Sequence, residues 1–83
     1  MKLKEGATYT RADYGVVVLD EHTGKYFRLN ETASWVFVHL VASDPPLDLE
    51  SEYSSRYGVE NDVARRDIGL VSERLVSLGV LIP

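Results

Sequence analysis

The sequence predicts an α+β fold, with a three-stranded antiparallel sheet at the N-terminus followed by three α-helices. Two observations indicate this order. Short segments rich in β-branched and aromatic residues, separated by turn residues, fill the chain before Asn30. Apolar residues at helical spacing, bounded by capping and stop residues, fill most of the rest. With 83 residues and no long linker, the chain is expected to form one domain, residues 1–83.

The predicted strands are Ala7–Ala12, Tyr14–Leu19 and Lys25–Leu29. The second carries the strongest signal, with three valines and a leucine closed by Asp20. Between the second and third strands, Thr23-Gly24 supplies a turn in which glycine takes a positive φ. This order indicates a meander of three antiparallel strands.

The third strand, Lys25–Leu29, is the last in this order and has one edge available to another chain. Side chains alternate across a strand, so Phe27 and Leu29 are expected to face the core, while Tyr26 and Arg28 face the open side. An unpaired strand beside a helical core is a place where a further chain can bind.

The first helix is expected to start at the cap residue Asn30 and to run through Val41. Apolar side chains occupy most of its circumference, which is typical of a central helix. Its polar breaks are Glu31, Thr32, Ser34 and His39. Asp44-Pro45-Pro46 is expected to end the helix as a stiff connector.

Two further helices are predicted. The second covers Leu47–Tyr57, with Gly58 as its C-terminal cap, and the third runs from Glu60 or Asn61 to Leu78, where Gly79 stops it. The apolar tail Val80–Ile82 either packs back on the core or adds a short strand.

When the residues of the third helix are placed around its axis at about 100° per residue, two neighbouring strips with apolar residues appear. The first is an ordinary core stripe, and the second mixes apolar residues with one acid and one base. The core stripe consists of Ala64, Ile68, Val71, Leu75 and Leu78, and the second strip of Val63, Asp67, Leu70 and Arg74. The second strip either widens the core or forms one wall of a binding groove, and helix geometry leaves both interpretations open.

Residues with catalytic potential are sparse, and we expect no enzymatic activity. His22 lies in a predicted turn and His39 on an apolar helix, and neither has a serine partner in a recognisable triad or nucleophile elbow. The sequence has no glycine-rich phosphate loop, no HExxH motif and no metal-ligand spacing, so no metal and no cofactor are expected. The absence of cysteine excludes disulfides, thiolate metal sites and cysteine nucleophiles.

Charge and hydropathy restrict the partners. A formal net charge of −4 argues against nonspecific binding to nucleic acid, and the doublet Arg65-Arg66 is flanked by Asp62 and Asp67. The sequence shows no secretory signal and no apolar run near the ~20 residues that span a bilayer. A cytoplasmic location without membrane contact is therefore expected.

The order of elements, together with several short motifs, resembles the PqqD-like peptide-recognition domains of pathways that make ribosomally synthesised, modified peptides. Within them, the sequence is most similar to the stand-alone lasso-peptide proteins usually called B1. The resemblance runs from about Tyr14 to Leu81. The motifs are Leu19-Asp20, Thr23-Gly24-Lys25-Tyr26, Leu29-Asn30-Glu31-Thr32-Ala33 and Trp35.

The resemblance implies a winged-helix-turn-helix-like fold that binds the leader segment of a precursor peptide. The leader would add as a strand to the third strand, in the cleft against the third helix. It would then pass to a separate cysteine leader peptidase, called B2, with the cyclase as a further candidate partner. Combining this with helix geometry, the candidate peptide-binding residues are Lys25, Tyr26, Phe27, Arg28, Leu29, Val63, Asp67, Leu70, Val71 and Arg74.

Three other interpretations remain open at the level of sequence. The domain could present a precursor to a radical enzyme or a cyclodehydratase, as a PqqD-type peptide chaperone. It could be a winged-helix nucleic-acid-binding protein, although such a protein normally carries a basic recognition helix. It could also be a structural subunit of a larger enzyme, with the second strip as an interface.

Overall fold

The computed structural model describes residues 1–44 and 46–83. The element order along the chain is β1 (Lys2–Leu3), β2 (Ala7–Ala12), β3 (Gly15–Asp20), β4 (Tyr26–Leu29), α1 (Glu31–Val41), α2 (Leu49–Tyr57), α3 (Asn61–Ser77) and β5 (Leu81–Ile82). The strands β2, β3 and β4 form a three-stranded antiparallel sheet in that order, and β1 pairs with β5 in a separate two-stranded sheet. This arrangement confirms the predicted α+β class.

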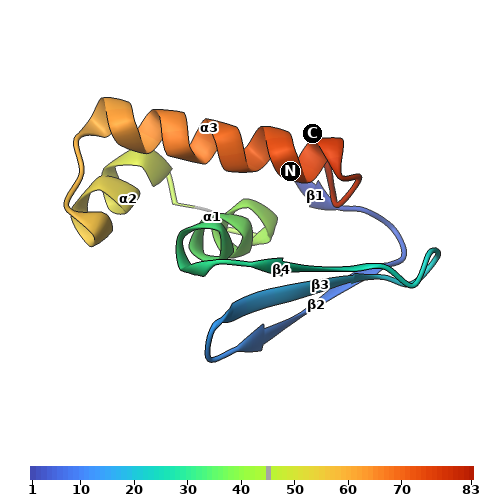
Figure 1. Cartoon of the computed structure of the whole chain (residues 1–83). Helices are drawn as coiled ribbons and strands as arrows, with labels where there is room; N and C mark the ends of the chain where they lie inside the picture. Colours follow the sequence, from blue (N-terminus) through green and yellow to red (C-terminus); the bar gives the residue numbers. More distant parts are fainter. Residues whose placement is uncertain (45) are drawn as a thin grey trace.

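The small sheet of β1 and β5 is the main addition to the predicted architecture. Leu81 pairs with Leu3 and is 2% exposed, so the apolar tail both packs on the core and forms a strand. The first strand was missed because two residues in a charged segment give no detectable alternation. Pairing the two ends of the chain brings the termini close together (Figure 1).

The layers are ordered so that α1 lies between the three-stranded sheet and the long helix α3 (Figure 1). The helix α2 packs beside the N-terminal half of α3, and β4 is the strand that leads directly into α1. The almost wholly apolar α1 is therefore central, as its sequence predicts, and of its residues only Glu31 is exposed.

Caps fix where the helices begin and end. The side chain of Asn30 accepts a hydrogen bond from the Ala33 N–H at 2.9 Å, which confirms the predicted cap of α1. Asp48 caps α2 in the same way through the Ser51 N–H at 3.0 Å, so α2 starts at Leu49, two residues later than predicted. Gly58 ends α2 in the left-handed conformation, with φ 65°. The predicted connector after α1 includes Pro45, which lies outside the described residues.

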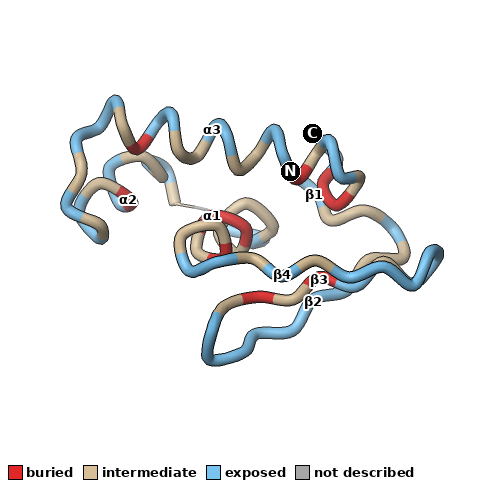
Figure 2. Tube along the Cα trace, viewed as in Figure 1, coloured by how far each residue is buried: buried red, intermediate tan, exposed pale blue. Residues whose placement is uncertain are grey.

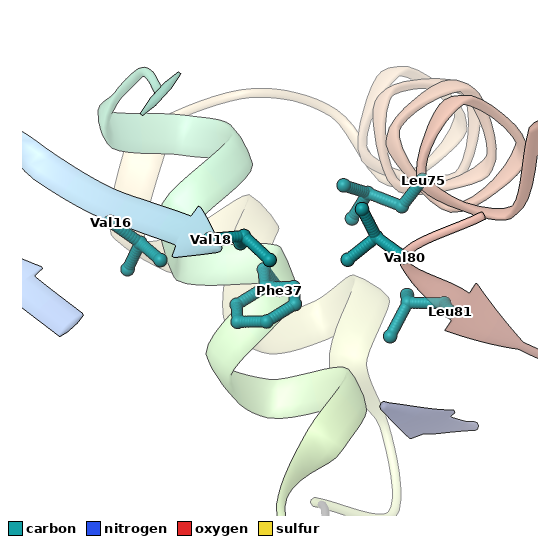
Figure 3. Close-up of a cluster of buried hydrophobic side chains, with 6 residues drawn as sticks. All are labelled: Val16, Val18, Phe37, Leu75, Val80 and Leu81. Carbon is teal, nitrogen blue, oxygen red and sulfur yellow. The ribbon is translucent and has the colours of Figure 1, made fainter. Parts of the chain in front are cut away.

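The core joins β3, α1 and the C-terminal end of the chain. Its buried side chains, shown in Figure 3, are Val16, Val18, Phe37, Leu75, Val80 and Leu81. A second cluster of Val36, Tyr53 and Ala64 holds the three helices together. Figure 2 shows buried segments on α1, on β3 and at the C-terminal end of the chain, whereas the turn between β3 and β4 is exposed.

Candidate functional site

The strand β4 has one paired edge and one open edge. Its pairing with β3 matches Val18 with Phe27 and Val16 with Leu29, so these side chains share the face that packs on the helices. Phe27 and Leu29 are partly buried against the core, whereas Tyr26 is 66% exposed. The predicted alternation along this strand is therefore confirmed. In the described part of the chain, no strand pairs with the other edge of β4.

One hydrogen bond indicates which backbone N–H and C=O groups of β4 face β3 and which face the open edge. The N–H of Asp20 donates to the carbonyl of Lys25 at 2.8 Å, so the Asp20 N–H and the Lys25 carbonyl face each other between β3 and β4. Hydrogen-bonded pairs alternate along an antiparallel ladder, so the backbone polar groups of Phe27 and Leu29 face β3. Those of Tyr26 and Arg28 face the open edge, and each residue carries one donor and one acceptor there.

A serine from α1 fixes the end of this edge strand. The Ser34 hydroxyl accepts a hydrogen bond from the Val16 N–H at 2.8 Å and donates one to the Leu29 carbonyl at 3.1 Å. Ser34 is 7% exposed, so these two bonds satisfy a buried hydroxyl and connect β3, β4 and α1. The sequence marked Ser34 only as a polar break, because a side-chain bridge between distant strands leaves no local pattern.

Gly15 makes this bridge sterically feasible. Its φ is 137°, a value that side chains rarely allow, and a β-carbon at this position would collide with the Leu29 carbonyl oxygen and the Ser34 hydroxyl. The start of β3 at Gly15, one residue after the predicted Tyr14, is consistent with this close approach.

A groove of about 600 Å³ lies between β4 and the C-terminal half of α3. Most of its lining is apolar, and its described lining includes no acidic residue. The lining residues are Tyr26, Phe27, Arg28, Leu29, Asn30, Ala33, Leu70, Val71, Arg74, Leu75 and Leu78. Seven of the ten candidate residues from the sequence, Tyr26, Phe27, Arg28, Leu29, Leu70, Val71 and Arg74, are thus brought together.

The helical wall of the groove carries leucines that the fold leaves accessible. Leu70 is 59% exposed and Leu78 is 41% exposed, and they flank Arg74 at intervals of four residues along α3. Leu78 was assigned to the core stripe, and this assignment is wrong. It lies after the last residue of α3 and lines the groove, whereas Leu75, at 1% exposure, belongs to the core and also contacts the groove.

Val63 and Asp67 do not line this groove. Seven residues along a helix correspond to about 10 Å, so Asp67 lies roughly that far from Arg74 along the axis although both share one side of α3. Asp67 instead accepts a hydrogen bond from the Tyr53 hydroxyl of α2 at 3.1 Å. The pKa of Tyr53 is raised above its ordinary value of 10.0, mainly by burial and secondly by this hydrogen bond to Asp67.

The remaining candidate, Lys25, precedes β4 and lies at the end of the exposed turn. Its N–H donates to the Thr23 hydroxyl at 3.2 Å, so its backbone is held by the turn, outside the groove lining. The guanidinium of Arg28 lies 4.4 Å from the centre of the Tyr14 ring. Arg28 therefore contributes main chain to the groove while its cation stacks on a neighbouring aromatic side chain.

The two histidines lie outside the groove. His39 shares a hydrogen bond of 2.7 Å between its Nδ1 and the Trp35 carbonyl, and its ring stacks on Trp35 with centroids 4.0 Å apart. His22 lies in the exposed turn, close to Gly6. Among the residues that the structure describes, no three His, Asp or Glu side chains gather in a way that would hold a metal ion. In the same residues, no helix is long and apolar enough to cross a membrane.

Sequence reasoning missed four groove residues: Asn30, Ala33, Leu75 and Leu78. A projection down the axis of α3 keeps the angle of each residue but discards its position along the helix. Which turns of α3 face β4 depends on how the two elements cross, and this information is not present in either segment alone.

The fold is thus a small α+β domain in which an open edge strand lies beside an apolar helical wall. The family model for coenzyme PQQ synthesis protein D (PqqD) matches residues 15–81, and the chain belongs to this family. No curated protein matches the sequence.

Two solved structures are similar along almost the whole chain. One is the lasso peptide synthetase B1 complexed with the leader peptide, with 33% identity, a TM-score of 0.88 and coverage of 99% of this chain and 96% of that one. The other is TbiB1 in complex with the TbiA(beta) leader peptide, with 25% identity, a TM-score of 0.85 and coverage of 98% and 94%. Both relatives are thus bound to leader peptides.

Proposed function

We propose that this protein binds the leader segment of a ribosomally made precursor peptide, of the lasso class, and presents it to a separate leader peptidase. The observation that carries the proposal is the open edge of β4 beside a groove whose leucines are accessible. The leader-bound state of two relatives similar over nearly the whole chain supports it.

In this proposal the leader adds as a strand to β4. The backbone groups of Tyr26 and Arg28 supply the hydrogen bonds, and the side chains of the leader alternate between the groove and the outer face of the sheet. Leu70, Val71 and Leu78 receive the groove-facing side chains. The binding residues are therefore Tyr26–Leu29 on one side and the C-terminal half of α3 on the other.

The domain itself would catalyse no reaction and would act in the cytoplasm, where ribosomes make the precursor. Its residues 1–83 would form one recognition domain that passes the bound leader to a cysteine peptidase of the B2 type. The excess of acids over bases, 13 to 9, disfavours a nucleic-acid strand as the occupant of the groove.

Binding is tested with a fluorescent leader peptide from the precursor gene that accompanies this protein. Affinity of about 1 μM or better, worth roughly 8 kcal/mol, is expected. No measurable binding at high protein concentration would refute the proposal.

Strand addition is tested separately with a matched pair of proline substitutions. Arg28→Pro removes an N–H that faces the open edge of β4 and should weaken binding more than Arg28→Ala, which keeps that N–H. Arg11→Pro makes the same change on the other edge strand, β2, where the Glu21 N–H to Gly6 carbonyl bond of 2.9 Å implies that the Arg11 N–H also faces outward. Equal losses for Arg28→Pro and Arg11→Pro would exclude β4 as the specific site.

A further inference from the structure

The groove differs in charge from the rest of the molecule. The chain has 13 acidic and 9 basic residues, yet the described lining of the groove includes Arg74 and the main chain of Arg28, whose guanidinium lies on the outer face of the sheet, and no acid. Among the described residues, neither arginine forms an ion pair within 4.0 Å, although Glu73 is adjacent to Arg74 in sequence. A partner strand would therefore meet two uncompensated cations.

These cations lie on opposite faces of the strand that would add to β4. Arg28 shares the outer face of the sheet with its cross-strand partner Val17, and its guanidinium stacks on Tyr14 there. Arg74 belongs to α3 and lines the groove between the exposed Leu70 and Leu78. Because successive side chains of a strand alternate between faces, one bound segment can present a group to each arginine.

Building on the proposed function, we propose that the groove selects an acidic, amphipathic strand in which the face of each acidic and apolar side chain is fixed. Side chains opposite Phe27 face α3, and among these we place an apolar anchor against Leu70 and Leu78 and a carboxylate that reaches Arg74. Side chains opposite Tyr26 and Arg28 face outward, and among these we place a second carboxylate that pairs with Arg28. The sequence positions of the two carboxylates therefore differ by an odd number.

Planar guanidinium groups suit carboxylates because they offer paired donors. A bound strand that covers Leu70 and Leu78 would also exclude water beside Arg74 and so reduce screening of its charge. Arg28 lies on the outer face of the sheet with its guanidinium on the Tyr14 ring, and a cross-strand charge pair on that face is of the weaker kind. The structure thus assigns the larger part of the selectivity to Arg74.

The test uses short random peptides displayed on phage and selected on the purified protein, on Arg74→Gln and on Arg28→Gln. Peptides selected on the wild-type protein should be enriched in Asp and Glu both at even and at odd spacings from an apolar anchor residue. Arg74→Gln should remove the enrichment at even spacings, which place the acid on the same face as the anchor. Arg28→Gln should remove it at odd spacings, which place the acid on the opposite face. Arg11→Gln on β2 is the control and should leave both unchanged. For one selected peptide, each substitution should weaken binding about two- to fivefold, with the larger loss for Arg74→Gln, and added salt should lessen both losses.

Enrichment without acids, or an acid preference that survives both groove substitutions, would overturn the inference. The precursor leader is then added as a competitor to separate this inference from the proposed function. A leader that displaces the selected peptides supports both. A leader that fails to compete overturns the proposed function, whereas the measured charge selection still stands for the displayed peptides.

Discussion

Leu70 and Leu75 lie five residues apart on α3 and are expected to respond in opposite ways to the same truncation. Leu70 is 59% exposed, so it has buried only about two-fifths of its surface. At roughly 1.5–3 kcal/mol for full burial of a leucine, Leu70→Ala should reduce the free energy of unfolding by at most about 1 kcal/mol. Leu75 is 1% exposed, and Leu75→Ala should cost about 3–5 kcal/mol.

Binding should show the reverse dependence on Leu70. If a leader strand covers the exposed 59% of Leu70, that contact contributes about 0.9–1.8 kcal/mol, and Leu70→Ala should weaken binding by about 5- to 20-fold. Leu70→Asp would also place a charge in this apolar contact and should abolish measurable binding.

Both quantities can be measured on the same samples. Urea unfolding is followed by the fluorescence of Trp35, the single tryptophan, and binding by the anisotropy of a labelled leader. If Leu70→Ala destabilises the protein as much as Leu75→Ala, Leu70 belongs to the core. If it leaves leader affinity unchanged, the peptide does not occupy this groove. Either result would refute the reasoning.

Three further perturbations test the framework of the site. Gly15→Ala should destabilise the fold by at least about 2 kcal/mol in chemical denaturation, because of its positive φ and the collision with the Leu29 carbonyl; a neutral effect would contradict this geometry. Ser34→Ala should cost about 1–3 kcal/mol and also lower leader affinity, whereas unchanged affinity would show that the bridge does not position β4. The pKa of Tyr53 in the folded protein is raised, so its contribution to stability is complete below pH 10.0 and is lost as the pH rises through the folded-state pKa. Tyr53→Phe should therefore reduce the loss of stability at alkaline pH, measured by urea unfolding at several pH values. An unchanged pH profile would exclude Tyr53 as the source of that loss.

Local sequence patterns predicted the helices and strands but not where these elements contact one another in space. Asn30 as a cap, Gly58 as a stop and the alternation of Tyr26 and Phe27 all depend on neighbouring residues, and the structure confirms them. The interaction of Asp67 with α2 and the exposure of Leu78 depend on where two helices and a strand meet in space. Sequence patterns alone therefore placed neither residue correctly relative to the groove: Asp67 lies outside it and Leu78 lines it.

The sheet has two open edges, and the difference between them explains why β4 is the expected site. The backbone of Tyr26 and Arg28 offers two donors and two acceptors, and at about 0.5–1.5 kcal/mol each these four bonds contribute about 2–6 kcal/mol. Association costs about 4 kcal/mol or more, so backbone pairing alone does not give micromolar binding.

The edge of β2 presents comparable backbone groups, but the exposed side chains of Leu70 and Leu78 line the groove beside β4. Burying Leu70 and Leu78 beneath apolar side chains of a peptide supplies the missing free energy, because each of these leucines has roughly half of its surface left to bury. If the leader adds as a strand, the position of α3 relative to the sheet, set by the packing of Leu75 against Phe37 and Val18, therefore favours β4 over β2.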